Sequence, residues 1–130
     1  MQRGIYGINK LKQLHYSADY KQFINYGQLK WLSKPLDTNH EAMLPHDSRT
    51  VVTHSILADL DKAILYLDIQ DNSSGMRVHK DVAHATKSEV ALFEGTWEKY
   101  HKAKGNKFYD PSVTDEKIKE YLTQSGQAAK

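Results

Sequence analysis

The longest regular apolar pattern lies in the middle of the chain. Its apolar residues recur at intervals of four, four, three and four: Val52, Ile56, Leu60, Ala63 and Leu67. This spacing stacks side chains on one face of an α-helix. Leu57 and Ile64 widen that face, and Leu65 and Ile69 begin a second one. A helix that is apolar on more than one side packs against more than one neighbour. The pattern therefore predicts a central helix over residues 48–70.

Both ends of this central helix leave an alternative open. At its start, either Asp47 or Ser48 can be the cap, because a short side-chain oxygen there accepts a free backbone N–H. At its end, residues 63–69 are apolar or aromatic at every position except Asp68, so they could instead form a short strand. The unbroken periodicity from Val52 onward favours the helix.

A helix is also predicted before the central one. It would begin at the cap residue Ser17 and end at about Ser33, because the residue before Pro35 is pushed away from helical angles. Gly27 inside it costs about 1 kcal/mol relative to Ala. The side chains available for packing are Tyr20, Phe23, Ile24 and Trp31.

Two more helices are predicted after the central one. The first covers residues 80–104 and ends at Gly105, a residue that suits the left-handed conformation of many helix ends. Its predicted inner face consists of Val82, Ala85, Val90, Phe93, Trp97 and Tyr100. The last helix begins at the cap residue Thr114 and runs to about Ser125, with Gly126 after its end. Its narrow apolar stripe consists of Ile118, Tyr121 and Leu122.

These elements predict an all-α fold. We expect one domain, residues 1–130, with four or five helices packed as a small bundle around the central helix 48–70. Residues 1–7 and 126–130 are expected to be flexible ends. A chain of 130 residues is long enough to bury a core, and its 8 Tyr, 2 Trp and 3 Phe supply large contact areas.

Composition excludes several classes of protein. The chain has no Cys, which removes disulfides, thiolate catalysis and Cys-type zinc sites. No apolar run approaches the roughly 20 residues of a membrane helix. The first residues lack the apolar stretch of a signal peptide. These features predict a cytoplasmic protein without a membrane partner.

The charge of the chain is unevenly distributed. Residues 1–36 carry six basic side chains and one acidic one, a net charge of +5. Residues 37–75 carry seven acidic and two basic side chains, a net charge of −5. Such asymmetry indicates either a basic binding surface or two segments that attract one another, within one chain or between chains.

One group of residues has a spacing that fits a metal site. Glu94, Glu98 and His101 are four and three residues apart, which places them on one stripe of the predicted helix. Carboxylate-bridged di-iron bundles use a Glu-x-x-His pair twice, with two further Glu, whereas this chain has the pair once. The alternative is a solvated stripe, which a favourable pair between Glu98 and Lys102 would support.

Other chemistry has no comparable pattern. The remaining histidines are not spaced as metal ligands. No Gly-flanked Ser of the kind that nucleophilic hydrolases use is present, and no Gly-rich loop could hold a phosphate. We therefore expect no cofactor.

The N-terminal region carries the clearest binding pattern. Basic side chains neutralise phosphates, and exposed aromatic side chains stack on unpaired bases or anchor a protein partner. The alternative is that the aromatic residues belong to the core and the lysines to its solvent face. The candidate binding residues are Lys10, Lys12, Tyr16, Tyr20, Lys21, Tyr26, Lys30, Trp31 and Lys34.

Three functions follow from these patterns. The first is a non-catalytic helical binding module, an accessory subunit or regulator that contacts a protein partner or a second copy through the N-terminal region. The second is a nucleic-acid-binding protein that uses the same region. The third is a metal-dependent enzyme built on Glu94, Glu98 and His101.

Overall fold

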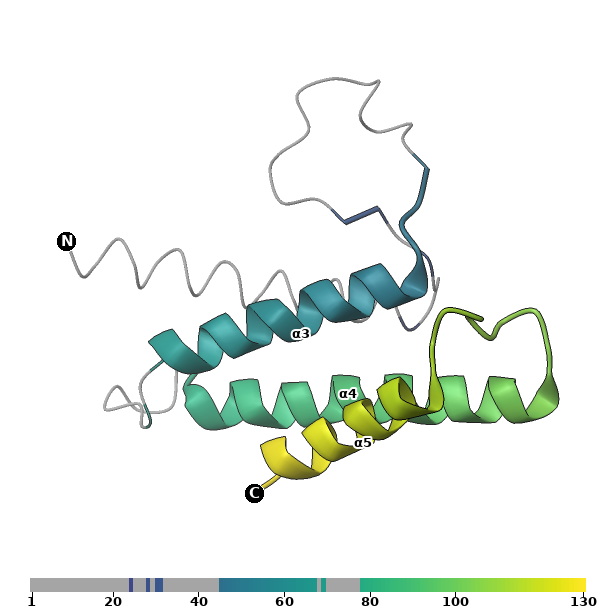
Figure 1. The fold of residues 1–130 in the computed structure, drawn as a ribbon. Coiled ribbons are helices and arrows are strands. Elements are labelled where there is room, and N and C mark those ends of the chain that lie inside the picture. The colour runs from purple at the N-terminus through teal and green to yellow at the C-terminus, as the bar shows by residue number, and fades with distance from the viewer. Residues whose placement is uncertain (1–23, 25–27, 29, 32–44, 68, 70–77) are drawn as a thin grey trace.

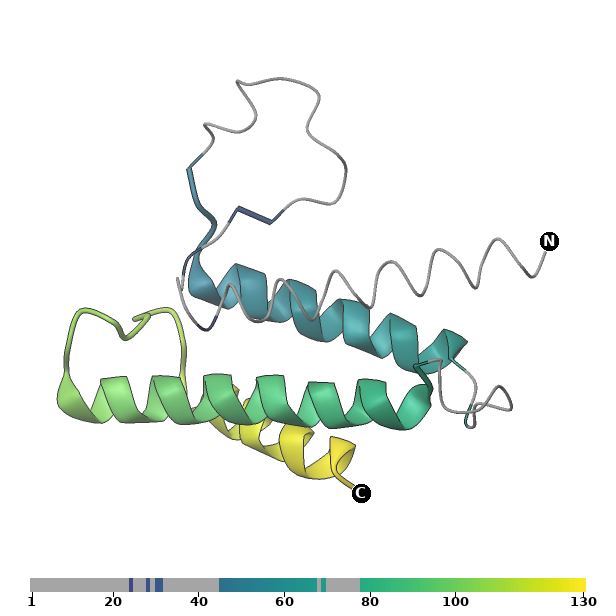
Figure 2. The ribbon, with the colours of Figure 1, turned by 180° about the vertical axis from the view of Figure 1, so that it is seen from behind.

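The described part of the chain is entirely helical. The computed structural model describes residues 24, 28, 30–31, 45–67, 69 and 78–130. These residues form three α-helices and no strand: α3 (Arg49–Tyr66), α4 (Lys80–Lys104) and α5 (Asp115–Ala128). In both views α4 lies between α3 and α5 and runs antiparallel to each (Figures 1 and 2). None of the described helices has the length and apolar character needed to cross a membrane.

The central helix was predicted correctly at its start and too long at its end. Ser48 is the cap, and its hydroxyl oxygen accepts the Val51 N–H at 3.4 Å. Helix α3 stops at Tyr66 because Leu67 has an extended backbone, four residues before the predicted end. The alternative strand over residues 63–69 is wrong for residues 63–66, which are helical.

Helix α3 buries the face that the sequence pattern predicted. Val52, Ile56, Leu57 and Leu60 pack with Val90 and Ala91 of α4 and with Tyr121 of α5, and together they form the buried apolar core. The half-buried Trp31 and Phe93 pack against this core from its edge. The core therefore lies where all three helices meet.

The predicted helix over residues 17–33 ends earlier than expected. Gln28, Lys30 and Trp31 are not helical. The Trp31 N–H donates to Asp47 Oδ2 at 2.8 Å, a bond to a side chain in place of the helical carbonyl that the prediction required. Most of the remaining residues of this predicted helix, and all of residues 1–16, lie outside the part that the structure describes.

Helix α4 has the predicted bounds, and its buried face agrees with the prediction in part: Val90 is buried and Phe93 packs against the core. Gly105 ends it with φ of 59°, and its N–H bonds the carbonyls of His101 and Lys102. Val82, Ala85 and Tyr100, which we expected inside, are exposed. The buried residues are Ala83, Val90, Ala91, Glu94, Gly95 and Glu98. The prediction followed large apolar residues, whereas the contact with α5 uses small residues and two glutamates.

Helix α5 begins at its predicted cap and runs further than predicted. The Thr114 hydroxyl oxygen accepts the Lys117 N–H at 3.3 Å. The helix continues through Gly126 to Ala128, so residues 126–128 are its last turn and not part of a flexible end. Ile118 and Tyr121 are buried as expected. Ser125 extends their stripe, and its carbonyl accepts the Ser88 hydroxyl at 3.0 Å.

The close approach of α4 and α5 at Gly95 generates a stability prediction. A Cβ at Gly95 would lie 2.9 Å from Leu122 Cδ2 and 3.3 Å from Tyr121 Cβ. Overpacking of this kind costs about 1–3 kcal/mol, whereas Ala gains about 1 kcal/mol in helix propensity over Gly. We expect Gly95→Ala to lower the free energy of unfolding by roughly 1 kcal/mol, measured by urea denaturation.

Gly126→Ala is the matched control for this prediction. Gly126 also lies inside a helix, but a Cβ there would have no neighbour within 4 Å. We expect this variant to be more stable than the wild type by up to about 1 kcal/mol. Equal stabilisation of both variants would show that α5 does not lie against Gly95.

Candidate functional site

Two of the nine candidate N-terminal binding residues lie in the described part of the chain. Lys30 Nζ pairs with Asp47 Oδ1 at 3.2 Å, and the Trp31 N–H donates to Oδ2 of the same carboxylate. These bonds, with that from the Trp31 backbone contributing most, hold the pKa of Asp47 below its usual value. Both residues are half-buried, and the Trp31 side chain packs against the core. They anchor the chain before α3 instead of forming an open surface.

The other seven candidate residues lie outside the described residues. They are Lys10, Lys12, Tyr16, Tyr20, Lys21, Tyr26 and Lys34.

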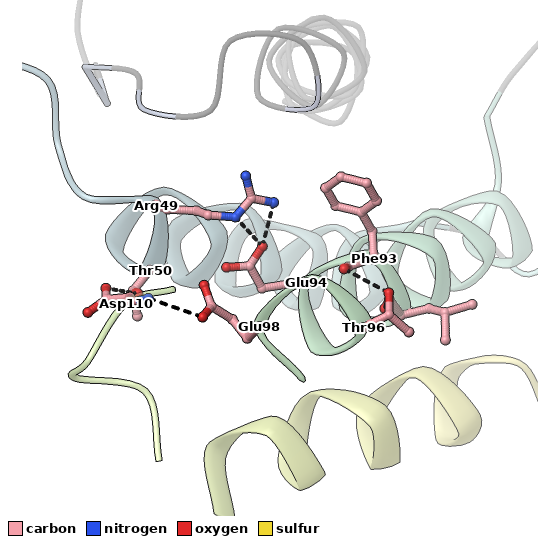
Figure 3. A network of polar contacts seen from close by, with 8 residues as sticks. Arg49, Thr50, Phe93, Glu94, Thr96, Glu98 and Asp110 are labelled. Atoms are coloured by element: carbon pink, nitrogen blue, oxygen red, sulfur yellow. Dashed lines mark hydrogen bonds and ion pairs between the residues drawn. The ribbon is translucent and has the colours of Figure 1, made fainter. Parts of the chain in front are cut away.

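A cluster of charged side chains is buried where the helices meet. We call Arg49, Glu94, Glu98, Asp110 and Tyr121 the carboxylate cluster. Arg49 is the first residue of α3, the two glutamates lie one turn apart on α4, and Tyr121 comes from α5. Asp110 belongs to the loop between α4 and α5. Figure 3 shows that Arg49 points toward Glu94, and that Asp110 lies between Thr50 and Glu98.

The strongest contact in the cluster joins α3 to α4. Arg49 Nε donates to Glu94 Oε2 at 2.9 Å, and Arg49 Nη2 forms an ion pair with the same oxygen at 2.8 Å. The Arg49 guanidinium also lies 4.2 Å from the centroid of the Trp97 ring and 5.3 Å from that of Phe93. A guanidinium suits this position because it forms ion pairs and stacks on aromatic rings at the same time.

The second glutamate is held by the loop. The Asp110 N–H donates to Glu98 Oε2 at 3.3 Å. The Asp110 carboxylate in turn accepts the Thr50 hydroxyl at 2.6 Å and the Ser112 N–H at 2.9 Å. Asp110 therefore ties the α4–α5 loop to the first turn of α3 and to the middle of α4.

Burial changes the proton affinities of this cluster. Glu94 and Glu98 are 0% exposed, and three polar atoms have no hydrogen-bond partner among the described residues: Glu94 Oε1, Glu98 Oε1 and the Tyr121 hydroxyl. Desolvation raises the pKa of Glu94 to about 7, although Arg49 opposes the shift. Desolvation also raises the pKa of Glu98. It raises the pKa of Tyr121 to about 12, with a further contribution from the Glu94 charge. At neutral pH the Glu94 carboxyl is therefore partly protonated.

Glu94, Glu98 and His101 were interpreted either as a metal site or as a solvated stripe, and the structure bears on both interpretations. The solvated stripe is wrong, because both glutamates are fully buried. The expected partner of Glu98, Lys102, pairs with Asp115 at 2.7 Å. His101 Nδ1 lies 2.8 Å from Asn106 Nδ2, and its ring packs on Trp97 at 4.3 Å. Within the described ranges no three His, Cys, Asp or Glu side chains gather as a metal ion requires.

A second candidate site lies on the surface at the end of α4. Residues 99–109 contain four lysines and no acidic residue. We define the lysine–aromatic surface as Lys99, Tyr100, Lys104, Lys107 and Phe108, all of which are exposed. Lys104 Nζ lies 4.5 Å from the Tyr100 ring centroid, and Lys107 Nζ lies 5.5 Å from that of Phe108. The sequence patterns did not single out these residues as a site, although the absence of acidic residues from 99–109 is visible in the sequence.

The chain matches no family model, and neither a curated protein nor a solved structure is significantly similar to it.

The carboxylate cluster predicts an unusual dependence of stability on pH. Because folding raises the pKa of Glu94 from 4.5 to about 7, the folded state binds a proton more tightly between these values. This contribution to the free energy of unfolding is roughly 3 kcal/mol. It is complete below pH 4.5 and is lost as the pH rises to about 7. Folding lowers the pKa values of three aspartates, Asp47, Asp110 and Asp115. Their contribution to stability is therefore lost as they become protonated below about pH 4. We expect maximum stability near pH 4.5 in urea denaturation.

Glu94→Gln tests the origin of this slope. The variant leaves Arg49 without its carboxylate and is expected to be less stable at every pH. Its stability should nevertheless fall less between pH 4.5 and 7, since only Glu98 still contributes. Glu89→Gln, at an exposed position on the same helix, is the control and should keep the wild-type slope. An unchanged slope in Glu94→Gln would contradict the assignment.

Proposed function

We propose that this chain is a non-catalytic helical binding module that acts by contact, as a subunit or regulator of a larger assembly. The observation that supports it most is the exposed apolar end of α3. Leu65, Tyr66 and Ile69 are 76%, 67% and 72% exposed. Leu65 and Tyr66 lie in the last turn of α3, and Ile69 follows three residues after its end. Apolar side chains concentrated at an exposed helix end are typical of protein contact sites.

The charge of the chain favours a second copy as the partner. Residues 37–75, which include α3, carry a net charge of −5. Residues 1–36 carry a net charge of +5. One copy thus offers a basic segment that complements the acidic segment of another, and complementary charge steers association. The seven N-terminal candidate residues outside the described part of the chain remain the proposed contact surface on the basic side. The four- or five-helix bundle remains a proposal for the whole chain.

Light scattering during size-exclusion chromatography tests this proposal. We expect the wild type to exceed the monomer mass as concentration rises, and to dissociate partly in high salt because salt screens charge steering. The double variant Leu65→Ser with Tyr66→Ser should remain monomeric at the same concentrations. Its helical circular dichroism should match that of the wild type, since both side chains are exposed.

Leu92→Ser is the matched control. Leu92 is an exposed apolar side chain near the middle of α4, away from the turn of α4 that lies beside the end of α3. This variant should self-associate as the wild type does. A wild type that stays monomeric at every concentration and salt would contradict self-association, and equal dissociation of both variants would contradict the assignment to the α3 end.

A further inference from the structure

The lysine–aromatic surface carries a charge that nothing described on the chain neutralises. Of the four lysines in residues 99–109, Lys102 pairs with Asp115 at 2.7 Å. The structure records no ion pair between the other three, Lys99, Lys104 and Lys107, and any carboxylate of the described residues. Because Lys107 lies beyond the end of α4, the helix dipole does not explain its position. The surface therefore presents three ammonium groups to an anionic partner.

The same surface presents two exposed aromatic rings that both contact the ring of His101. Tyr100 is 54% exposed and Phe108 is 56% exposed. Their ring centroids lie 5.2 Å and 5.5 Å from that of His101, which they flank. The His101 ring packs on Trp97 at 4.3 Å, and Trp97 lies against Arg49 of the carboxylate cluster. The exposed rings are thus the outer members of a series of edge-to-face and tilted ring contacts that begins at the buried cluster.

Rings and ammonium groups are paired on this surface. Each exposed ring has one lysine within 6 Å of its centroid, Lys104 at Tyr100 and Lys107 at Phe108. A base that stacks on such a ring brings its own phosphate toward the neighbouring ammonium group. This combination of stacking platform and positive charge is how proteins hold single strands without sequence preference. An acidic peptide would use the lysines but would offer no planar group for the rings.

We propose that the lysine–aromatic surface binds single-stranded nucleic acid, with bases stacked on Tyr100 and Phe108 and phosphates near Lys104 and Lys107. A duplex fits less well, because its bases are stacked on one another and their faces are not accessible. This inference is independent of the self-association proposed for α3, since the two surfaces lie at opposite ends of the described helices (Figure 1).

Fluorescence anisotropy with labelled 12-residue oligothymidylate and oligouridylate tests the proposal. We expect saturable binding by the full chain at low salt, and weaker binding to a duplex of the same length. Tyr100→Ala with Phe108→Ala should weaken binding by at least roughly tenfold, because each stacked base contributes about 5- to 150-fold. Tyr100→Phe with Phe108→Tyr keeps both rings and should bind like the wild type.

The salt dependence tests the lysines separately. Lys104→Gln with Lys107→Gln should reduce the slope of log affinity against log salt by about 1.4, the value for two phosphate contacts to a single strand. Lys119→Gln, an exposed lysine on α5, is the control and should leave this slope unchanged. All variants change exposed side chains, so unchanged circular dichroism is expected for each.

Three results would overturn the proposal. They are the absence of binding at low salt, equal affinity for single strand and duplex, and wild-type affinity in the variant that lacks both rings. Oligoglutamate of the same length is the remaining comparison. If it binds as tightly as the oligonucleotides, the surface recognises acidic protein segments and not nucleic acid. The light-scattering test of self-association through α3 uses no oligonucleotide, so its outcome does not depend on whether this surface binds nucleic acid.

Discussion

The ion pair between Arg49 and Glu94 is the contact on which the arrangement of the helices depends. It joins the first residue of α3 to α4 by a hydrogen bond and an ion-pair contact to one carboxylate oxygen. A buried charge is tolerated only with a partner of opposite sign. The guanidinium therefore fixes the register in which α3 lies on α4. The cluster holds three carboxylates and one arginine, and because burial raises the pKa of Glu94 to about 7, this glutamate is partly protonated near neutral pH.

The buried glutamates also determine how α5 packs. Their stripe on α4 includes Ala91 and Gly95, residues small enough for α5 to approach closely. Tyr121 of α5 closes the cluster from the other side and places its hydroxyl in the same apolar surroundings. Polar burial and close helix contact are thus two aspects of one interface. The large aromatic side chains of α4 are left for the edge of the core and for the surface.

Structural features that depend on neighbouring residues were predicted from the sequence. Features that depend on contacts between distant residues were not. Thr114 and Gly105 were recognised as helix ends, and Ser48 was one of two candidate caps, because capping is a property of a few adjacent positions. The buried face of α4 was misplaced, since nothing near Glu94 in the sequence indicates that Arg49 will lie beside it. Asp47 was considered only as a cap, whereas it binds Lys30 and Trp31. No local pattern marked Asp110 as the residue that ties the loop to two helices.

The position of Asp110 has a consequence for any ligand at the end of α4. Its backbone and side chain bond Glu98, Thr50 and Ser112, and nearby the Tyr109 hydroxyl donates to the Val113 carbonyl at 2.6 Å. Ordering a loop residue costs about 1–2 kcal/mol of conformational entropy. Here that ordering is completed when the helices pack. The loop that presents Phe108 and Lys107 is therefore preorganised, and contacts formed there lose little of their free energy to ordering the loop.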